Sequence, residues 1–195
     1  MTAAATGQVV RLQPETCGVL VIDWQEKLAA AMDPEVYPRH LKNALALVQG
    51  AALFRVPVVA TEQYPQGLGP TVAPLREALA AEGVAAPVIA KKDFSAWAVP
   101  EVRAQVQAAG RTKWIVLGME SHVCVFQTVR DLKEAGFTVF VPRDAVVSRT
   151  RDNWKVGVKL CEAVGATATS TEAVLFDWVG RAEGDAFKAV SRLVR

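Results

Sequence analysis

Short apolar runs alternate along this chain with longer stretches in which apolar and polar residues follow a helical period. The runs predict strands at residues 19–22, 56–60, 85–90, 113–118, 138–141 and 165–169. The amphipathic stretches predict helices at residues 38–50, 99–110, 124–136, 153–164, 171–179 and 185–193. Uninterrupted runs of β-branched and other apolar residues are typical of strands that are buried on both faces.

Strands that alternate with helices at this spacing predict a doubly wound α/β fold. We expect a mostly parallel sheet of about six strands with helices on both faces, and a single domain over residues 1–195. Residues 63–74 contain three prolines and two glycines and are expected to form an irregular loop. Residues 1–16 are expected to be partly flexible.

Composition narrows the range of partners and compartments. The chain is 51% hydrophobic and 22% charged, with a formal net charge of +2. Without a strong cluster of Lys and Arg, nucleic acid is not an expected partner. No apolar run approaches the roughly 20 residues of a membrane span. Cys17, Cys124 and Cys161 are odd in number and widely spaced. They do not resemble a disulfide framework and favour a cytoplasmic location.

Reactive side chains follow several of the predicted strands directly. Asp23, Glu62, Lys91 and Cys124 each stand just after one. Ligands of open parallel sheets bind beyond the carboxyl ends of the strands, so an acid, an amine and a thiol on one rim indicate a reactive site. Cys124 also falls on the first turn of a predicted helix, where backbone N–H groups and the helix dipole favour the nucleophilic thiolate.

Each of these residues also has a structural explanation when it is taken alone. Cys124 could be a small buried hydrophobe, as free cysteines often are. Asp23 could cap a turn or helix, and Lys91 could be a solvated charge like Lys92. The two histidines show no metal-ligand spacing, and the Gly67-Leu68-Gly69 fragment is not a dinucleotide fingerprint. The sequence therefore predicts no metal and no cofactor.

Four segments resemble the isochorismatase-like cysteine hydrolase superfamily, in particular its branch of isochorismatase domain-containing proteins. They are LVIDWQEKL at 20–28, TEQYPQGLG at 61–69, KKDFSAW at 91–97 and GMESHVCV at 118–125. The D-x-Q and G-x-E-x-H-V-C-V stretches together are specific, and the resemblance covers about residues 17–195. It implies a Rossmann-type three-layer fold, in agreement with the alternation described above, and a homo-oligomeric assembly.

The resemblance also implies a catalytic triad of Asp23, Lys91 and Cys124. The family's lysine stands three residues before an aromatic residue that serine follows, which selects Lys91 over Lys92. The family pattern further implies a cis peptide bond between Met119 and Glu120, and an oxyanion hole formed by the backbone N–H groups of Glu120 and Cys124. Nicotinamidases of the superfamily bind a metal through an aspartate and histidines after the second strand. No histidine stands there in this chain, so a metal-independent reaction is expected.

These observations predict a hydrolase of a small amide or a related C–N or acyl bond, acting through a thioester. In this scheme Asp23 exchanges protons, Lys91 stabilises the thiolate and Cys124 is the nucleophile. The weaker candidates for substrate contact are Trp24, Gln63, Tyr64, Trp97 and His122. Two alternatives are a non-catalytic interaction protein that retains the fold and a redox-sensing thiol protein.

Overall fold

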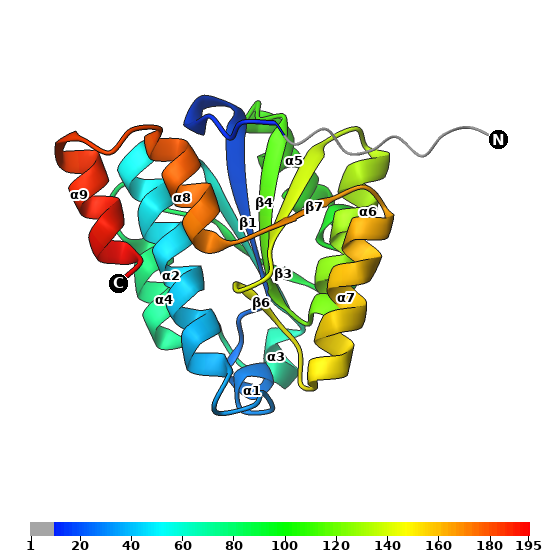
Figure 1. The fold of residues 1–195 in the computed structure, drawn as a ribbon. Coiled ribbons are helices and arrows are strands. Elements are labelled where there is room, and N and C mark those ends of the chain that lie inside the picture. The colour runs from blue at the N-terminus through cyan, green and yellow to red at the C-terminus, as the bar shows by residue number, and fades with distance from the viewer. Residues whose placement is uncertain (1–9) are drawn as a thin grey trace.

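The protein is built on one parallel sheet with helices on both faces (Figure 1). The computed structural model describes residues 10–195. The strands are β1 Cys17–Ile22, β2 Val58–Gln63, β3 Val88–Lys91, β4 Lys113–Met119, β5 Thr138–Pro142, β6 Val146–Val147 and β7 Thr167–Thr169. Their order is β3-β2-β1-β4-β5-β7, with β6 paired to β4, and every neighbouring pair is parallel. The predicted fold class is confirmed.

The helices form two layers. They are α1 Glu26–Ala29, α2 Tyr37–Phe54, α3 Pro65–Leu68, α4 Ala73–Ala80, α5 Pro100–Ala108, α6 Phe126–Glu134, α7 Arg151–Ala163, α8 Thr171–Val179 and α9 Gly184–Leu193. Helices α2, α4, α8 and α9 enclose one apolar core, and α5, α6 and α7 enclose the other (Figure 1). Because both faces of the sheet are covered, every residue of β1 is buried, which explains its continuous apolar run.

Two regions of the chain differ from the sequence-based expectation. The expected irregular loop at 63–74 contains the short helix α3 and the start of α4, each with a proline in its first turn. Proline is tolerated there because the first N–H groups of a helix have no partner inside it. The second expected strand, at 56–60, lies two residues later, since Arg55 ends α2 in a left-handed conformation.

The amino-terminal segment is anchored over the part that the structure describes. Leu12 packs into the core, and its backbone N–H donates to the Asp177 carboxylate. The flexibility expected for residues 1–16 stays a prediction, and residues 1–9 lie outside the described part of the chain. Within residues 10–195, no helix is both long enough and apolar enough to cross a membrane.

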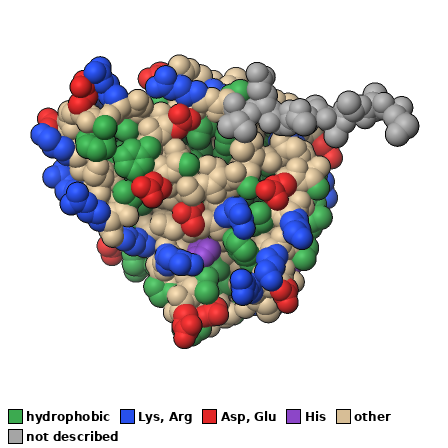
Figure 2. All heavy atoms as spheres, in the orientation of Figure 1, with side chains coloured by type: hydrophobic (Ala, Val, Ile, Leu, Met, Phe, Trp, Pro, Cys, Tyr) green, Lys and Arg blue, Asp and Glu red, His purple; other side chains and the backbone are tan. Residues whose placement is uncertain are grey.

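Charged side chains of both signs are interspersed over the face shown in Figure 2, as the small net charge suggests. In the lower half of this face, several Lys and Arg side chains gather around a histidine.

The strand order creates a topological switch point between β1 and β4. The chain builds β2 and β3 on one side of β1 and then crosses to build β4, β5 and β7 on the other. Open α/β sheets bind their ligands outside the carboxyl ends of the strands at such a switch point.

Candidate active site

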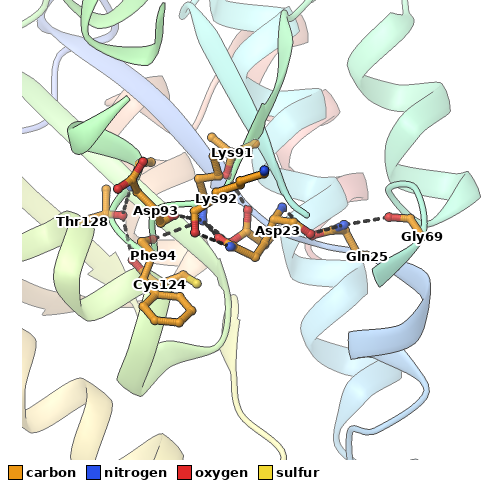
Figure 3. Close-up of polar contacts among 12 residues, drawn as sticks. Asp23, Gln25, Gly69, Lys91, Lys92, Asp93, Phe94, Cys124 and Thr128 are labelled. Atoms are coloured by element: carbon orange, nitrogen blue, oxygen red, sulfur yellow. Dashed lines mark hydrogen bonds and ion pairs between the residues drawn. The ribbon is translucent and has the colours of Figure 1, made fainter. Parts of the chain in front are cut away.

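The three predicted triad residues come together at this switch point. Asp23 follows β1, Lys91 is the last residue of β3, and Cys124 lies in a π turn, Ser121–Val125, which joins β4 to α6. Asp23 adopts a left-handed backbone conformation with φ of 51°, and its N–H donates to the carbonyl of Thr61 at 3.1 Å. This turn directs its side chain along the sheet edge toward Lys91 (Figure 3).

Asp23 and Lys91 form a buried ion pair. Lys91 Nζ lies 2.7 Å from Asp23 Oδ2, and both side chains are 0% exposed. The other carboxylate oxygen, Oδ1, accepts a hydrogen bond of 2.7 Å from Thr61 Oγ1. Removing two charges from water is costly unless they pair closely and satisfy their remaining hydrogen-bonding capacity; the pair is close, while Asp23 Oδ2 has no hydrogen bond beyond the ion pair.

The Lys91 ammonium is held by three further acceptors. Its Nζ lies 2.6 Å from Gln63 Oε1, 3.2 Å from the Asp93 carbonyl and 3.1 Å from the Phe94 carbonyl. Together with Asp23, these groups leave the ammonium a single well-defined position (Figure 3). The neighbouring Lys92 takes no part in the ion pair, which agrees with the choice of Lys91.

Gln63 was expected to contact substrate, and the structure gives its amide a different set of partners. Its Oε1 accepts from Lys91, and its Nε2 donates to the Lys92 carbonyl at 2.7 Å. Gln25 in turn holds the backbone of Gln63 with bonds of 2.7 Å to its N–H and 3.0 Å to its carbonyl. A third bond, of 2.7 Å, runs from Gln25 to the Gly69 carbonyl. The D-x-Q motif contained Gln25, but nothing local assigned it this supporting role.

Cys124 faces the ion pair from the π turn. The Asp23 carboxylate and the Lys91 ammonium both act on the pKa of its thiol, and the residue is 6% exposed. The turn is tied to α6 by a 2.7 Å hydrogen bond from Thr128 Oγ1 to the Cys124 carbonyl. Thr128 Oγ1 also accepts a 2.8 Å bond from the N–H of Ala96.

The surroundings of the thiol act on its pKa. Burial, followed by the adjacent Asp23 carboxylate, raises the pKa of Cys124 to about 12, while Lys91 opposes the increase. Loss of water and the neighbouring negative charge oppose the thiolate that the start of a helix was expected to favour, so that expectation stays a prediction. Burial also raises the pKa of Asp23 against the effect of Lys91. A carboxylate with a raised pKa is a stronger base beside the thiol.

The aromatic candidates occupy different environments. Trp24 is 0% exposed and packs against Tyr37 in the core under α2, with 6.0 Å between ring centroids. Trp97 is half-buried and meets the Phe137 ring edge-on at 5.4 Å. Tyr64 is 51% exposed. Full burial disfavours substrate contact for Trp24 and favours a packing role, whereas Tyr64 has free surface.

A second polar network holds the turn that carries Cys124. The peptide bond between Met119 and Glu120 is cis, as the family pattern implies. The buried carboxylate of Glu120 pairs with Arg149 and lies 3.4 Å from His122 Nδ1. His122 Nδ1 is also 3.1 Å from Ser148 Oγ. His122 therefore belongs to the network that supports the turn.

The remaining acidic and metal-ligating side chains were compared with the needs of other kinds of site. Glu62, which also follows β2, accepts hydrogen bonds of 2.6 Å and 2.7 Å from Thr71 and so lies apart from the ion pair. In the described part of the chain, no three His, Cys, Asp or Glu side chains gather as a metal site would require. All three cysteines are free and buried.

Sequence comparison relates most of the chain to known proteins. The model of the isochorismatase domain matches residues 17–173. Isochorismatase domain-containing protein 2 from Bos taurus is 34% identical over 195 residues, which cover 99% of this chain and 90% of that protein.

Solved structures agree with this relation. MAR1 ribonuclease from Caenorhabditis elegans superposes with a TM-score of 0.86 at 34% identity, covering 95% of this chain and 92% of that one. YcaC from Pseudomonas aeruginosa, solved with hexane-2,5-diol and covalent acrylamide, gives 0.84 at 27% identity over 92% and 89% of the two chains.

YcaC from Escherichia coli, described as an octameric hydrolase of unknown specificity, gives a TM-score of 0.85 at 26% identity. This match covers 95% of the present chain and 89% of the E. coli chain. The domain match, the curated relative and the shared fold lead to one conclusion: the chain belongs to the isochorismatase family.

Proposed function

We propose that the protein is a metal-independent cysteine hydrolase of small amides or related C–N and acyl bonds, with Asp23, Lys91 and Cys124 as its catalytic residues. The observation that carries the proposal is the fully buried ion pair of 2.7 Å between Lys91 and Asp23, placed against the Cys124 thiol. A structural cysteine gains nothing from a buried base and a buried cation, whereas a nucleophilic cysteine needs both.

The first half-reaction forms a thioester. Asp23 takes the thiol proton as the sulfur attacks the substrate carbonyl carbon, so no free thiolate has to accumulate. Lys91 stabilises negative charge on the sulfur. The backbone N–H groups of Glu120 and Cys124 would receive the developing oxyanion, at about 3–4 kcal/mol for each donor. The tetrahedral intermediate then expels the amine, which leaves with the proton from Asp23.

The second half-reaction restores the enzyme. Asp23 removes a proton from water, the resulting hydroxide adds to the thioester carbonyl, and the carboxylic acid departs as the sulfur regains its proton. Gln63 acts on Lys91 and not on the substrate, because its amide is already committed to Lys91 and to the Lys92 carbonyl. Tyr64 and the half-buried Trp97 remain our candidates for substrate contact.

Two relatives support this proposal. The P. aeruginosa YcaC carries covalent acrylamide, a small amide that also reacts with nucleophiles. The E. coli YcaC is a hydrolase and an octamer. We therefore propose that this chain also acts as a homo-oligomer. Its three free thiols suit a reducing compartment such as the cytoplasm.

The proposal is tested with a panel of small primary amides, by following ammonia release together with the intact mass of the protein. We expect a transient acyl adduct and turnover in the wild type, and neither in Cys124→Ala. The matched control is Cys161→Ala, which removes another buried thiol and should leave turnover unchanged. Undiminished turnover in Cys124→Ala would remove the basis of the mechanism.

Peroxide treatment and an RNA substrate, added to the amide panel, separate the alternatives. A redox thiol would be oxidised by peroxide reversibly and in preference to Cys17 and Cys161, although its raised pKa makes this harder. A non-catalytic protein would show neither acyl adduct nor selective oxidation. Because one relative is called a ribonuclease, an RNA oligonucleotide belongs in the panel, and cleavage that persists in Cys124→Ala would indicate different chemistry.

A further inference from the structure

A second cavity opens at the same edge of the sheet, on the other side of β6 from Cys124. Its volume is about 670 Å³, and it lies between the start of α2, the end of β5 and the starts of α7 and α8. None of the triad residues lines it. Pockets that hold small organic ligands have volumes of about 300–1,000 Å³, so the size suits a metabolite.

Three arginines line this cavity, which we name the arginine pocket: Arg39, Arg143 and Arg151. Within residues 10–195, none of the three guanidinium groups belongs to an ion pair. They come from three separate segments of the chain. Positive side chains in the wall of a cavity attract an anion that enters it.

The two carboxylates in the wall are already engaged. Asp144 Oδ1 accepts 2.9 Å and 3.1 Å hydrogen bonds from the N–H and hydroxyl of Thr171, at the start of α8. Asp33 Oδ1 accepts a 2.8 Å bond from the N–H of Glu35. These bonds orient the carboxylates, whose negative charges still offset two of the three arginines, so the pocket keeps an excess of one positive charge. The start of α7, at Arg151, adds the positive end of a helix of 13 residues.

Part of the remaining wall is apolar, while Ser148, Thr169 and Ser170 add hydroxyl groups. Trp154 is fixed by hydrogen bonds of 3.1 Å from its Nε1 to the carbonyls of Arg143 and Val146. The Arg143 guanidinium lies over the Trp154 ring, 5.2 Å from its centre, which leaves its edge free to bind an anion. The buried Val147 adds apolar surface. An inorganic ion would leave this surface empty, so the expected ligand has an apolar body as well as a charge.

The buried His40 forms the floor of the pocket without adding charge. Its Nδ1 lies 3.0 Å from the Val146 carbonyl, which makes Nδ1 the protonated nitrogen of the neutral ring. Burial, helped by the neighbouring Arg39, lowers the pKa of His40. The three guanidinium groups at the rim therefore supply the positive charge of the pocket at neutral pH.

We propose that the arginine pocket binds a small organic anion, a carboxylate or a phosphate ester with an apolar body, at a site separate from the Asp23–Lys91–Cys124 triad. The proposal rests on the excess of arginines over carboxylates in the lining, the size of the cavity and the apolar part of its wall, and it does not depend on the reaction at Cys124.

The test measures binding to the full-length protein by calorimetry, with benzoate and phenyl phosphate as probes and benzyl alcohol as the uncharged comparison. We expect saturable binding of at least one anion, no binding of benzyl alcohol, and affinity at least tenfold weaker in the double variant Arg39→Gln/Arg151→Gln. Arg192→Gln on α9 is the matched control and should bind like the wild type. Cys124→Ala should also bind like the wild type, which keeps this test independent of catalysis.

Several outcomes would overturn the proposal. These are no saturable binding of either anion, equal affinity in the double variant, or loss of binding in Cys124→Ala. Two further outcomes would also overturn the proposal and would give the three arginines a different role. One is arginine-dependent binding of an RNA oligonucleotide without binding of the small anions. The other is a change in oligomeric state in the double variant without any change in anion affinity. Circular dichroism would verify that each variant is folded.

Discussion

At the scale of single residues, Asp23 has two opposing effects on Cys124. As a base it can accept the proton of Cys124, but as a buried negative charge it raises the pKa of that same thiol. Lys91 moderates both effects through the 2.7 Å ion pair. In the proposed mechanism, the proton would therefore move within a coupled group and no thiolate would have to be stored.

This coupling predicts that variants of the two charged residues shift the thiol in opposite directions. Asp23→Asn should lower the pKa of Cys124 below about 12, because it removes the nearby negative charge, and Lys91→Ala should raise it further. The measurement is the pH dependence of Cys124 alkylation by chloroacetamide, followed by mass spectrometry. Lys92→Ala is the control and should leave the profile unchanged; shifts of the same sign in both variants would refute the coupled site.

The sequence located the residues of the triad but not their state. Asp23, Lys91 and Cys124 could be found because each stands next to a strand end, and strand ends share an edge of the sheet. The raised thiol pKa could not be found, since burial by distant residues causes it. Likewise, Gln25 supports Gln63 across 38 positions of sequence, a distance that no local pattern spans.

At the scale of elements, the contact between α7 and the π turn depends on a glycine. A Cβ atom at Gly157 would lie 2.5 Å from the Ser121 carbonyl carbon and 2.6 Å from the His122 nitrogen. These are backbone atoms of the turn that presents Cys124, so the helix would have to move away. In the sequence, Gly157 lies inside the predicted helix at 153–164, and no local pattern indicates its contact with the turn.

Gly157→Ala should therefore reduce stability by about 1–3 kcal/mol and also impair turnover, since the turn shifts with the helix. Gly50→Ala is the matched control, because a Cβ atom there would meet the side-chain end of Leu175, 2.2 Å away and remote from Cys124. It should reduce stability without changing the rate. The measurements are the free energy of unfolding in urea and the rate of amide turnover for both variants. An unchanged rate in Gly157→Ala would show that the position of α7 does not affect the turn that carries Cys124.

At the scale of the whole molecule, the sheet brings together residues that are far apart in sequence. Arg39, Arg143 and Arg151 come from α2, the β5–β6 connection and the start of α7, and only the strand order brings them to one cavity. The alternation of strands and helices was enough to predict the fold class. It was not enough to predict strand order, and so the arginine pocket could not be foreseen.

The buried His40 links the pocket region to global stability. Burial and Arg39 lower its pKa, against the opposing effects of the Val146 carbonyl and Asp144. The unfolded ring gains its proton near the ordinary value of 6.5 and the folded ring only at lower pH, so acidification below about pH 6.5 favours unfolding. In His40→Gln, the free energy of unfolding should fall less between about pH 7 and pH 5 than in the wild type. Equal slopes in urea titrations would disprove this contribution.

The raised pKa of Cys124 also bears on how long the enzyme would survive in the cell. Peroxides and disulfides attack thiolates, and a sulfur that keeps its proton and is 6% exposed reacts slowly with them. Only a compound small enough to reach Cys124 and polar enough to engage Asp23 would draw the proton away. A Cys124 thiol that keeps its proton until substrate binds would therefore be protected from oxidation, without a partner cysteine or a reducing enzyme to repair it.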